Sequence, residues 1–244
     1  MQPDSPWRVY GPSCRAPQGH NKCPFCVMFI GANIAHHAQL RIKNECDAMR
    51  EAFKSCFGED SWRRRVEFKA DCFANPASFM EDVMRFEPSI LHFSCHGDVR
   101  GLWLSGSQSV VESGCIVDAL AAHNKEVESG CQIQLVIVNL CMSGPLASAL
   151  SGCVDFVIGH GKREVGDIEA MSFSKTLLKA LGRGRSLDGS FKAAKVASSP
   201  FRLYAHRFNP EELFLPVPAL PLLTSENVPS LVQNGQAATD EWRE

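Results

Sequence analysis

Residues 135–144 read LVIVNLCMSG, an unbroken apolar run that stops at a cysteine followed by small residues. Such a run predicts a β-strand buried on both faces, because a strand with one face in water alternates apolar and polar side chains. Ser143, Gly144 and Pro145 end the run and open a helix. We therefore expect Cys141 at the carboxyl end of a central strand.

A second buried run covers residues 90–95, ILHFSC, and is followed directly by His96 and Gly97. In an open parallel sheet, ligands bind at the carboxyl ends of the strands. His96 and Cys141 would both lie there, as a candidate base and a candidate thiol nucleophile.

The segments around these two runs alternate between strand and helix patterns. Strands are expected at 25–31 and 154–159, with a half-buried strand at 66–72 and a hairpin around 101–106. Asn75, Asp167 and Ser186 are predicted to cap helices. The helices are expected within residues 40–57, 76–86, 117–127, 144–150, 167–182 and 187–197. This alternation predicts an α/β fold with a mostly parallel sheet and helices on both faces.

The prolines divide the chain into three parts. Five of the 14 lie in residues 1–24 and six lie from Pro200 onward. A chain of 244 residues with 45% hydrophobic content can bury one substantial core. We expect one domain over residues 25–210, an amino-terminal extension over 1–24 and a flexible tail over 211–244.

The net charge limits the binding partners that we expect, and the cysteine content indicates the cellular compartment. The net charge is −2 and the pI is near 6.4, so neither nucleic acid nor a membrane surface is an expected partner. No apolar segment is long enough for a membrane span, and the amino end lacks the pattern of a secretory signal. Most of the eleven cysteines lie in apolar patterns, as free thiols do in a reducing compartment. These features predict a cytosolic or nuclear protein, and of the two we expect the cytoplasm.

Three other kinds of functional site that occur in α/β folds are excluded by the residues at the positions where each needs a particular side chain. A cysteine phosphatase needs an arginine six positions after its cysteine, where this chain has Ala147. A nucleophile elbow needs a glycine two positions before the nucleophile, where Asn139 stands. Residues 159–162, GHGK, lack the spacing of a phosphate-binding loop.

The two strand-end motifs, LHFSCHG at 91–97 and VNLCMSG at 138–144, resemble the catalytic motifs of the CHAT domain, a family of caspase-like cysteine peptidases. The His-to-Cys spacing of about 50 residues is that of caspases, although the residues after the cysteine differ from the caspase signature. Residues 29–33, 40–53, 157–159, 170–173 and 181–187 resemble other CHAT elements, so the resemblance covers roughly residues 27–200. It implies a caspase-like three-layer sandwich.

The resemblance also implies roles for individual residues. Cys141 corresponds to the nucleophile and His96 to the general base, with the backbone amides of Gly97 and Cys141 as the oxyanion hole. A side chain at position 97 is expected to crowd the substrate. Asn139 corresponds to a residue of the first specificity pocket, and its neutral side chain leaves the cleavage preference open. The implied partners are a protein or peptide substrate and a protein that could activate the enzyme; no cofactor or metal is expected.

The same residues allow plainer interpretations. The fold could serve as a signalling or interaction module without peptidase activity. We interpret His92 as a structural residue of the strand. We interpret Cys95 as a packing residue, because strand alternation directs it to the face opposite His96. Cys23 and Cys26, with Cys14 and His20 upstream, form only a weak zinc pattern. Residues 62–65, WRRR, are expected in a solvated loop, and residues 162–167 are the first place to look for an activating cut.

Overall fold

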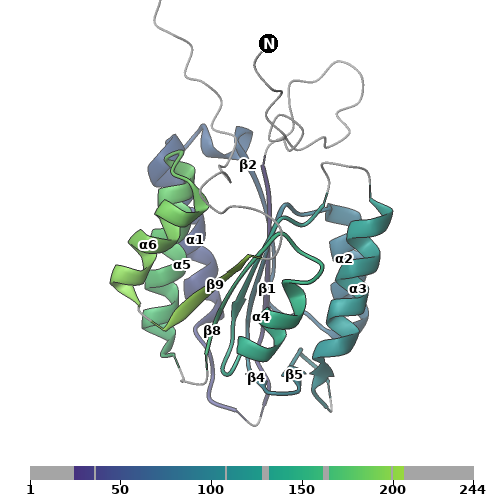
Figure 1. Ribbon diagram of the computed structural model, residues 1–244. Helices are drawn as coiled ribbons and strands as arrows, with labels where there is room; N and C mark the ends of the chain where they lie inside the picture. Colours follow the sequence, from purple (N-terminus) through teal and green to yellow (C-terminus); the bar gives the residue numbers. More distant parts are fainter. Residues whose placement is uncertain are drawn as a thin grey trace, which may run out of the picture.

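The computed structural model describes residues 25–205 apart from residues 36, 108, 128–131, 162–164 and 199. A six-stranded sheet forms its centre (Figure 1). The first five strands in its spatial order are parallel, and the last pairs antiparallel with its neighbour. In spatial order the strands are β2 (Val66–Asp71), β1 (Phe25–Ala32), β3 (Ile90–Cys95), β7 (Leu135–Asn139), β8 (Phe156–His160) and β9 (Phe201–Ala205).

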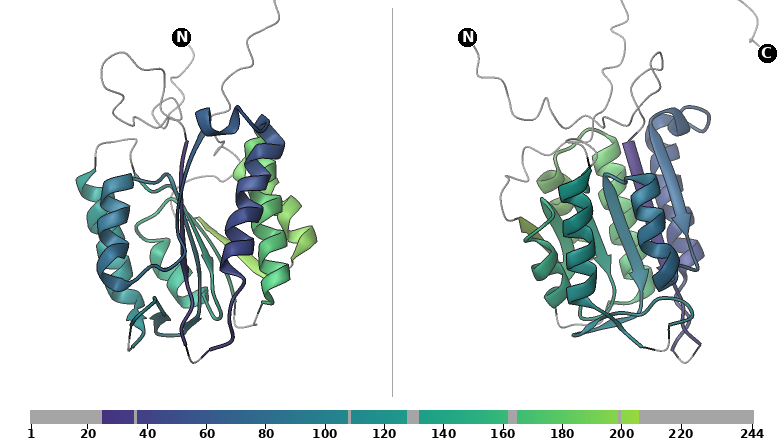
Figure 2. Two further views of the ribbon diagram at one scale, coloured as in Figure 1. Left: turned by 180° about the vertical axis from the view of Figure 1, so that it is seen from behind. Right: turned by 90° about the vertical axis from the view of Figure 1, so that its right-hand side faces the viewer.

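Helices cover both faces of the sheet (Figures 1 and 2). One face carries α1 (Ile42–Phe57), α5 (Asp167–Gly182) and α6 (Leu187–Ala197). The other carries α2 (Pro76–Phe86), α3 (Ser113–Glu126) and α4 (Gly144–Leu150). The predicted three-layer α/β architecture is therefore confirmed.

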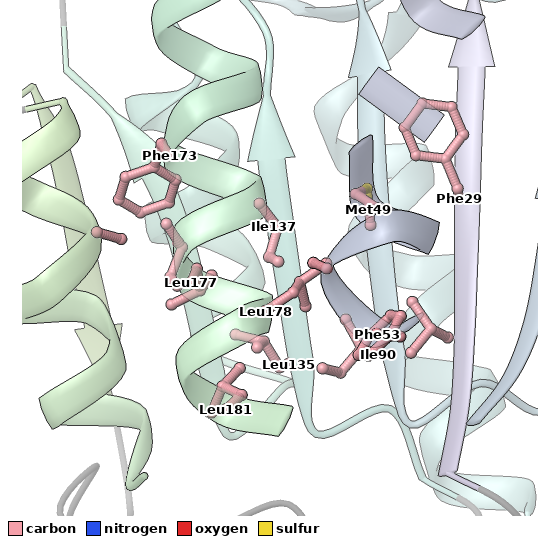
Figure 3. Packing of buried hydrophobic residues seen from close by; sticks show 14 of the residues in the cluster. Phe29, Met49, Phe53, Ile90, Leu135, Ile137, Phe173, Leu177, Leu178 and Leu181 are labelled. Atoms are coloured by element: carbon pink, nitrogen blue, oxygen red, sulfur yellow. The ribbon is translucent and has the colours of Figure 1, made fainter. Parts of the chain in front are cut away.

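The burial of each strand follows its sequence pattern. Every residue of β3, β7 and β8 is buried, as their continuous apolar runs require. The edge strand β2, whose sequence alternates between apolar and polar residues, is mostly half-buried. Between the sheet and the α1–α5 layer lies a core that includes Phe29, Phe53 and Phe173, each fully buried (Figure 3). Burying one such side chain contributes about 1.5–3 kcal/mol.

Two helix caps are confirmed and one is wrong. The side chain of Asn75 accepts hydrogen bonds from the backbone N–H groups of Ala77 and Ser78, and that of Ser186 accepts one at the start of α6. Asp167 makes no cap for its own helix. Its carboxylate instead accepts the backbone N–H of Arg41 at 3.0 Å, which joins the start of α5 to the residue before α1.

Several boundaries differ from the expectations. Strand β7 ends at Asn139, so Cys141 lies in the turn that follows the strand and not in the strand itself. Helix α3 begins at Ser113, four residues earlier than expected. Strand β9 was not predicted, because it is short and follows directly on a proline-containing segment.

Two surface segments are more ordered than expected. The hairpin around residue 101 is a small antiparallel sheet of β4 (Gly97–Asp98), β5 (Gly101–Leu102) and β6 (Val111–Glu112). The segment expected to be a solvated loop is partly a 3-10 helix, Trp62–Arg64, whose Trp62 is buried against the core. In the described part of the chain, no helix combines the length and apolar character needed to cross a bilayer.

Candidate active site

Strands β3 and β7 are neighbours, and both candidate motifs follow their carboxyl ends. Ser94 and Asn139 are the last pair in the register of these strands, and His96 and Cys141 each come two residues later. A pocket of about 30 Å³ between the two motifs is lined by both His96 and Cys141. The structure thus brings together the two residues that the sequence proposed as base and nucleophile.

The proton position on His96 is fixed by a backbone partner. Its Nε2 atom lies 2.7 Å from the carbonyl oxygen of Ala38, in the loop before α1. Because a carbonyl oxygen only accepts, Nε2–H must donate. In the neutral ring the Nδ1 atom is then the one that can take a proton.

The surroundings of His96 favour its neutral form. Burial lowers the pKa of His96 below its ordinary value of 6.5, and the nearby His37 acts in the same direction. The hydrogen bond to Ala38 and the charge of Asp167 act in the opposite direction but do not outweigh burial. The rings of His37 and His96 lie with their centroids 4.8 Å apart. At neutral pH the imidazole is therefore ready to accept a proton.

Cys141 lies in a tight turn. The next residue, Met142, has φ +54°, a left-handed conformation that costs a side-chain-bearing residue about 1–2 kcal/mol. Ser143 is fully buried; its Oγ donates to the carbonyl oxygen of His160 at 3.1 Å and accepts the N–H of His160 at 2.7 Å. The turn that carries Cys141 is thereby attached to the end of β8.

Gly97 is needed for a reason that was not expected. A Cβ atom at position 97 would lie 2.1 Å from Cδ1 of Leu140 and 3.0 Å from the carbonyl oxygen of Gly101. The space beside Gly97 is thus filled by the chain's own Leu140, the residue before Cys141, and does not lie open for a substrate. The glycine lets the histidine and cysteine motifs pack directly against each other.

The amide of Gly97 points away from the small sheet. The backbone N–H of Trp103 donates to the carbonyl oxygen of His96 at 2.8 Å, which makes these two residues a hydrogen-bonded pair. Gly97 and Leu102, the next pair in the register, are then a pair without mutual hydrogen bonds. The N–H of Gly97 is therefore not used in the pairing with β5.

Glu45 on α1 is part of this site and was missed. It is 4% exposed, lines the pocket, and lies among donors from three other elements. Burial raises the pKa of this carboxyl, but the interaction with His92 and the hydrogen bonds from His92, Ser94 and Asn139 outweigh burial and lower it below 4.5. A signal existed in the sequence, since Glu45 falls on the buried stripe of an amphipathic helix, between Ile42 and Met49.

The remaining predicted residues can now be placed. Asn139 lines the pocket, but its Nδ2 donates to Oε1 of Glu45 at 2.8 Å; its role in substrate binding stays a prediction. His92 is fully buried, stacked on Phe29 and hydrogen-bonded to Glu45 at 2.9 Å, which agrees with the structural role expected for it. Cys95 is also buried, on the opposite face of the sheet, and burial raises its pKa.

Another histidine, His160, was not proposed as a site residue. It lines the same pocket from the end of β8, is 1% exposed, and packs edge-to-face on Phe201 with ring centroids 5.4 Å apart. The signal available was its position directly after the strand expected at residues 154–159, as His96 follows the run at 90–95.

Two proposals made from the sequence, a zinc site and an activating cut, involve residues that lie largely outside the described part of the chain. Within residues 25–205 as described, no three histidine, cysteine, aspartate or glutamate side chains gather to hold a metal ion. Of the weak zinc pattern, Cys14, His20 and Cys23 lie outside the described residues, and Cys26 is buried in β1. Residues 162–164, in the segment proposed for an activating cut, also lie outside them.

Comparison with known proteins finds similarity in three-dimensional structure but not in sequence. The sequence matches no protein-family model, and no curated protein is similar to it. A secreted C11 cysteine protease from Bacteroides thetaiotaomicron, solved with an irreversible peptide inhibitor, is similar with a TM-score of 0.51 and 12% sequence identity, over 72% of this chain and 59% of that chain. An inactive zymogen C11 protease from Parabacteroides distasonis has a TM-score of 0.44 and 12% identity, over 75% of this chain and 62% of that chain.

The chain spans less than two thirds of the length of either protease. The protease with the TM-score of 0.51 is a C11 protease and not a CHAT protein, so membership of the CHAT family stays a prediction. What the comparison establishes is architectural: the chain has the caspase-like α/β fold found in a C11 cysteine protease.

Proposed function

We propose that this protein is a caspase-like cysteine endopeptidase that hydrolyses peptide bonds in protein substrates. One observation carries the proposal: His96, with its Nε2 proton fixed by Ala38, and Cys141 line one pocket at the ends of adjacent parallel strands. The peptide inhibitor bound to the similar C11 protease supports a peptide substrate. Membership of the CHAT family, a cytoplasmic location and activation by a partner protein are further parts of this proposal.

The proposed reaction begins with proton transfer from the thiol of Cys141 to Nδ1 of His96. The thiolate attacks the carbonyl carbon of the scissile bond and forms a tetrahedral intermediate whose oxyanion accepts hydrogen bonds from the amides of Gly97 and Cys141. The intermediate collapses, the C–N bond breaks, and His96 returns its proton to the leaving amine. Water, deprotonated by His96, then hydrolyses the thioester and frees Cys141.

Three features of the structure agree with the assigned roles. The neutral imidazole favoured by burial is the form that accepts a proton. The N–H of Gly97, which is not used in pairing with β5, is a suitable donor to an oxyanion. The left-handed turn at Met142 directs the backbone sharply away after Cys141, and such strained turns cluster at active sites.

A peptide library from a proteome digest tests the proposal. Wild-type protein should release new peptide ends with a consistent residue before the cut, and Cys141→Ala and His96→Ala should release none. Cys115→Ala, which removes an exposed cysteine of α3, is the matched control and should cleave like wild type. Equal cleavage by wild type and Cys141→Ala would contradict the proposal.

The second candidate function is that of a signalling or interaction module, which has the same fold but does not cleave peptide bonds. It is favoured by the small size of the pocket between the two motifs, about 30 Å³. A peptidase in this state must open its pocket when substrate or an activating partner binds. A peptide-based thiol electrophile that labels Cys141 in wild type but not in His96→Ala would support the peptidase, and the absence of labelling under all conditions would support the silent module.

A further inference from the structure

One buried carboxylate holds the ends of both strands that carry the candidate dyad. Oε2 of Glu45 accepts a hydrogen bond from Oγ of Ser94 at 2.6 Å, and Oε1 accepts one from Nδ2 of Asn139 at 2.8 Å. Ser94 and Asn139 lie opposite each other in the β3–β7 register. Glu45 therefore bridges the two strands from helix α1, at the point where their pairing ends.

The bridged pair lies directly before the reacting residues. Ser94 precedes His96 by two positions and Asn139 precedes Cys141 by two positions. No later pair in the register joins β3 to β7 among the described residues. What fixes Ser94 and Asn139 therefore contributes to the positions of His96 and Cys141, alongside the bonds of His96 to Ala38 and of the following turn to β8. Hydrogen bonds to an ionised acceptor are shorter and stronger than those between neutral groups.

Two more donors from the chain bind the same carboxylate. Nε2 of His92 donates to Oε1 at 2.9 Å and Oγ of Ser174 donates to it at 3.1 Å. Three donors thus bind Oε1 and one binds Oε2, so most of the acceptor capacity of the carboxylate is used within the chain. Although Glu45 lines the pocket, its bonds run to its own chain, which indicates a role in holding the site and not in binding a substrate side chain.

We propose that Glu45 is the positioning residue for the dyad: through Ser94 and Asn139 it sets the separation of His96 and Cys141. The inference rests on the proposed function, since it assigns a partner to that same pair. It predicts that losing a bond to a strand end affects the chemistry of Cys141, whereas losing a bond to another element affects only stability.

Ser94→Ala and Ser174→Ala form a matched pair for this test. Each removes one hydroxyl donor to Glu45, but Ser94 belongs to β3 beside the site, while Ser174 belongs to α5. The measurement is the rate of alkylation of Cys141 by iodoacetamide between pH 6 and 8, read by mass spectrometry on the peptide that carries it. The rate must be resolved by site, because the chain holds other cysteines and the neighbouring Cys46 lowers the pKa of the Cys72 thiol below its ordinary value.

We expect Ser94→Ala to slow alkylation of Cys141 by about tenfold, since small displacements of reacting groups cost rate steeply, and Ser174→Ala to change it by less than about twofold. Both variants should lower the melting temperature similarly. Equal rates for the two serine variants, with His96→Ala still slowing the reaction, would overturn the role of Glu45 and leave the proposed function standing. An unchanged rate in His96→Ala would overturn both.

Discussion

The Nε2 atom of His96 lies 2.7 Å from the carbonyl oxygen of Ala38, so the backbone of the loop before α1 holds the imidazole in one tautomer. Among the hydrogen bonds of the described residues, the one that His96 makes through its ring is to this carbonyl and not to a carboxylate, so the carbonyl is the group that orients the ring. The loop is therefore part of the candidate catalytic unit.

The first prediction concerns that loop. Ala38→Gly keeps the carbonyl but loosens the backbone that presents it, at a cost of about 0.5–1 kcal/mol, or up to about fivefold in kcat. KM should change little, because the substrate does not need this contact. Steady-state kinetics on a peptide found in the library would check the result. A change confined to KM would contradict an orienting role for the carbonyl.

The second prediction concerns the acid side of the pH profile. His37 lowers the pKa of His96 and Asp167 raises it, although burial has the largest effect. His37→Gln should therefore move the acid limb of kcat/KM to higher pH, and Asp167→Asn should move it to lower pH. Glu169→Gln, a carboxylate two residues further along α5, is the control and should leave the limb in place. Shifts of the same sign in the His37 and Asp167 variants would show that another group controls the limb.

The third prediction concerns Gly97. Gly97→Ala places a methyl group against Leu140, and overpacking of this kind costs about 1–3 kcal/mol of unfolding free energy. Leu140→Ala removes the opposing side chain, so the double variant should be more stable than the sum of the two single effects predicts. Urea denaturation of all four proteins measures this coupling. Strict additivity would mean that the two motifs do not pack as described.

The fourth prediction concerns stability in acid. Because the folded pKa of Glu45 lies below its ordinary value of 4.5, its ionised form stabilises the fold above about pH 4.5, and this contribution is lost as the pH falls through the folded pKa. Glu45→Gln cannot ionise, so the stability gap between wild type and this variant should narrow as the pH falls from 6 to 3. Melting temperatures across this range test it. Glu51→Gln, which removes a surface carboxylate of α1 paired with Lys54, should show a small gap that varies little.

The features that the sequence predicted are those set by neighbours along the chain. Continuous apolar runs identified β3 and β7, and the cap at Asn75 followed from an asparagine directly before a proline. His96 and Cys141 could be paired because parallel strands place their carboxyl ends at one edge of the sheet.

The features that were missed depend on partners far away in the chain. Glu45 is 94 residues from Asn139, and the acceptor for His96 is a backbone carbonyl 58 residues upstream, which no side-chain pattern encodes. Asp167 looked like a helix cap, but its carboxylate bonds to Arg41, 126 residues away. Such contacts follow only from the folded arrangement of α1 and α5 around the sheet.

The most direct test of the central claim is the mass of the protein after reaction with a peptidyl acyloxymethyl ketone carrying a sequence cleaved in the library. The account predicts one added inhibitor residue per chain, located on Cys141, absent in Cys141→Ala and strongly slowed in His96→Ala. Modification at another cysteine, or labelling of Cys141 at the same rate with and without His96, would contradict the assignment of these two residues as nucleophile and base.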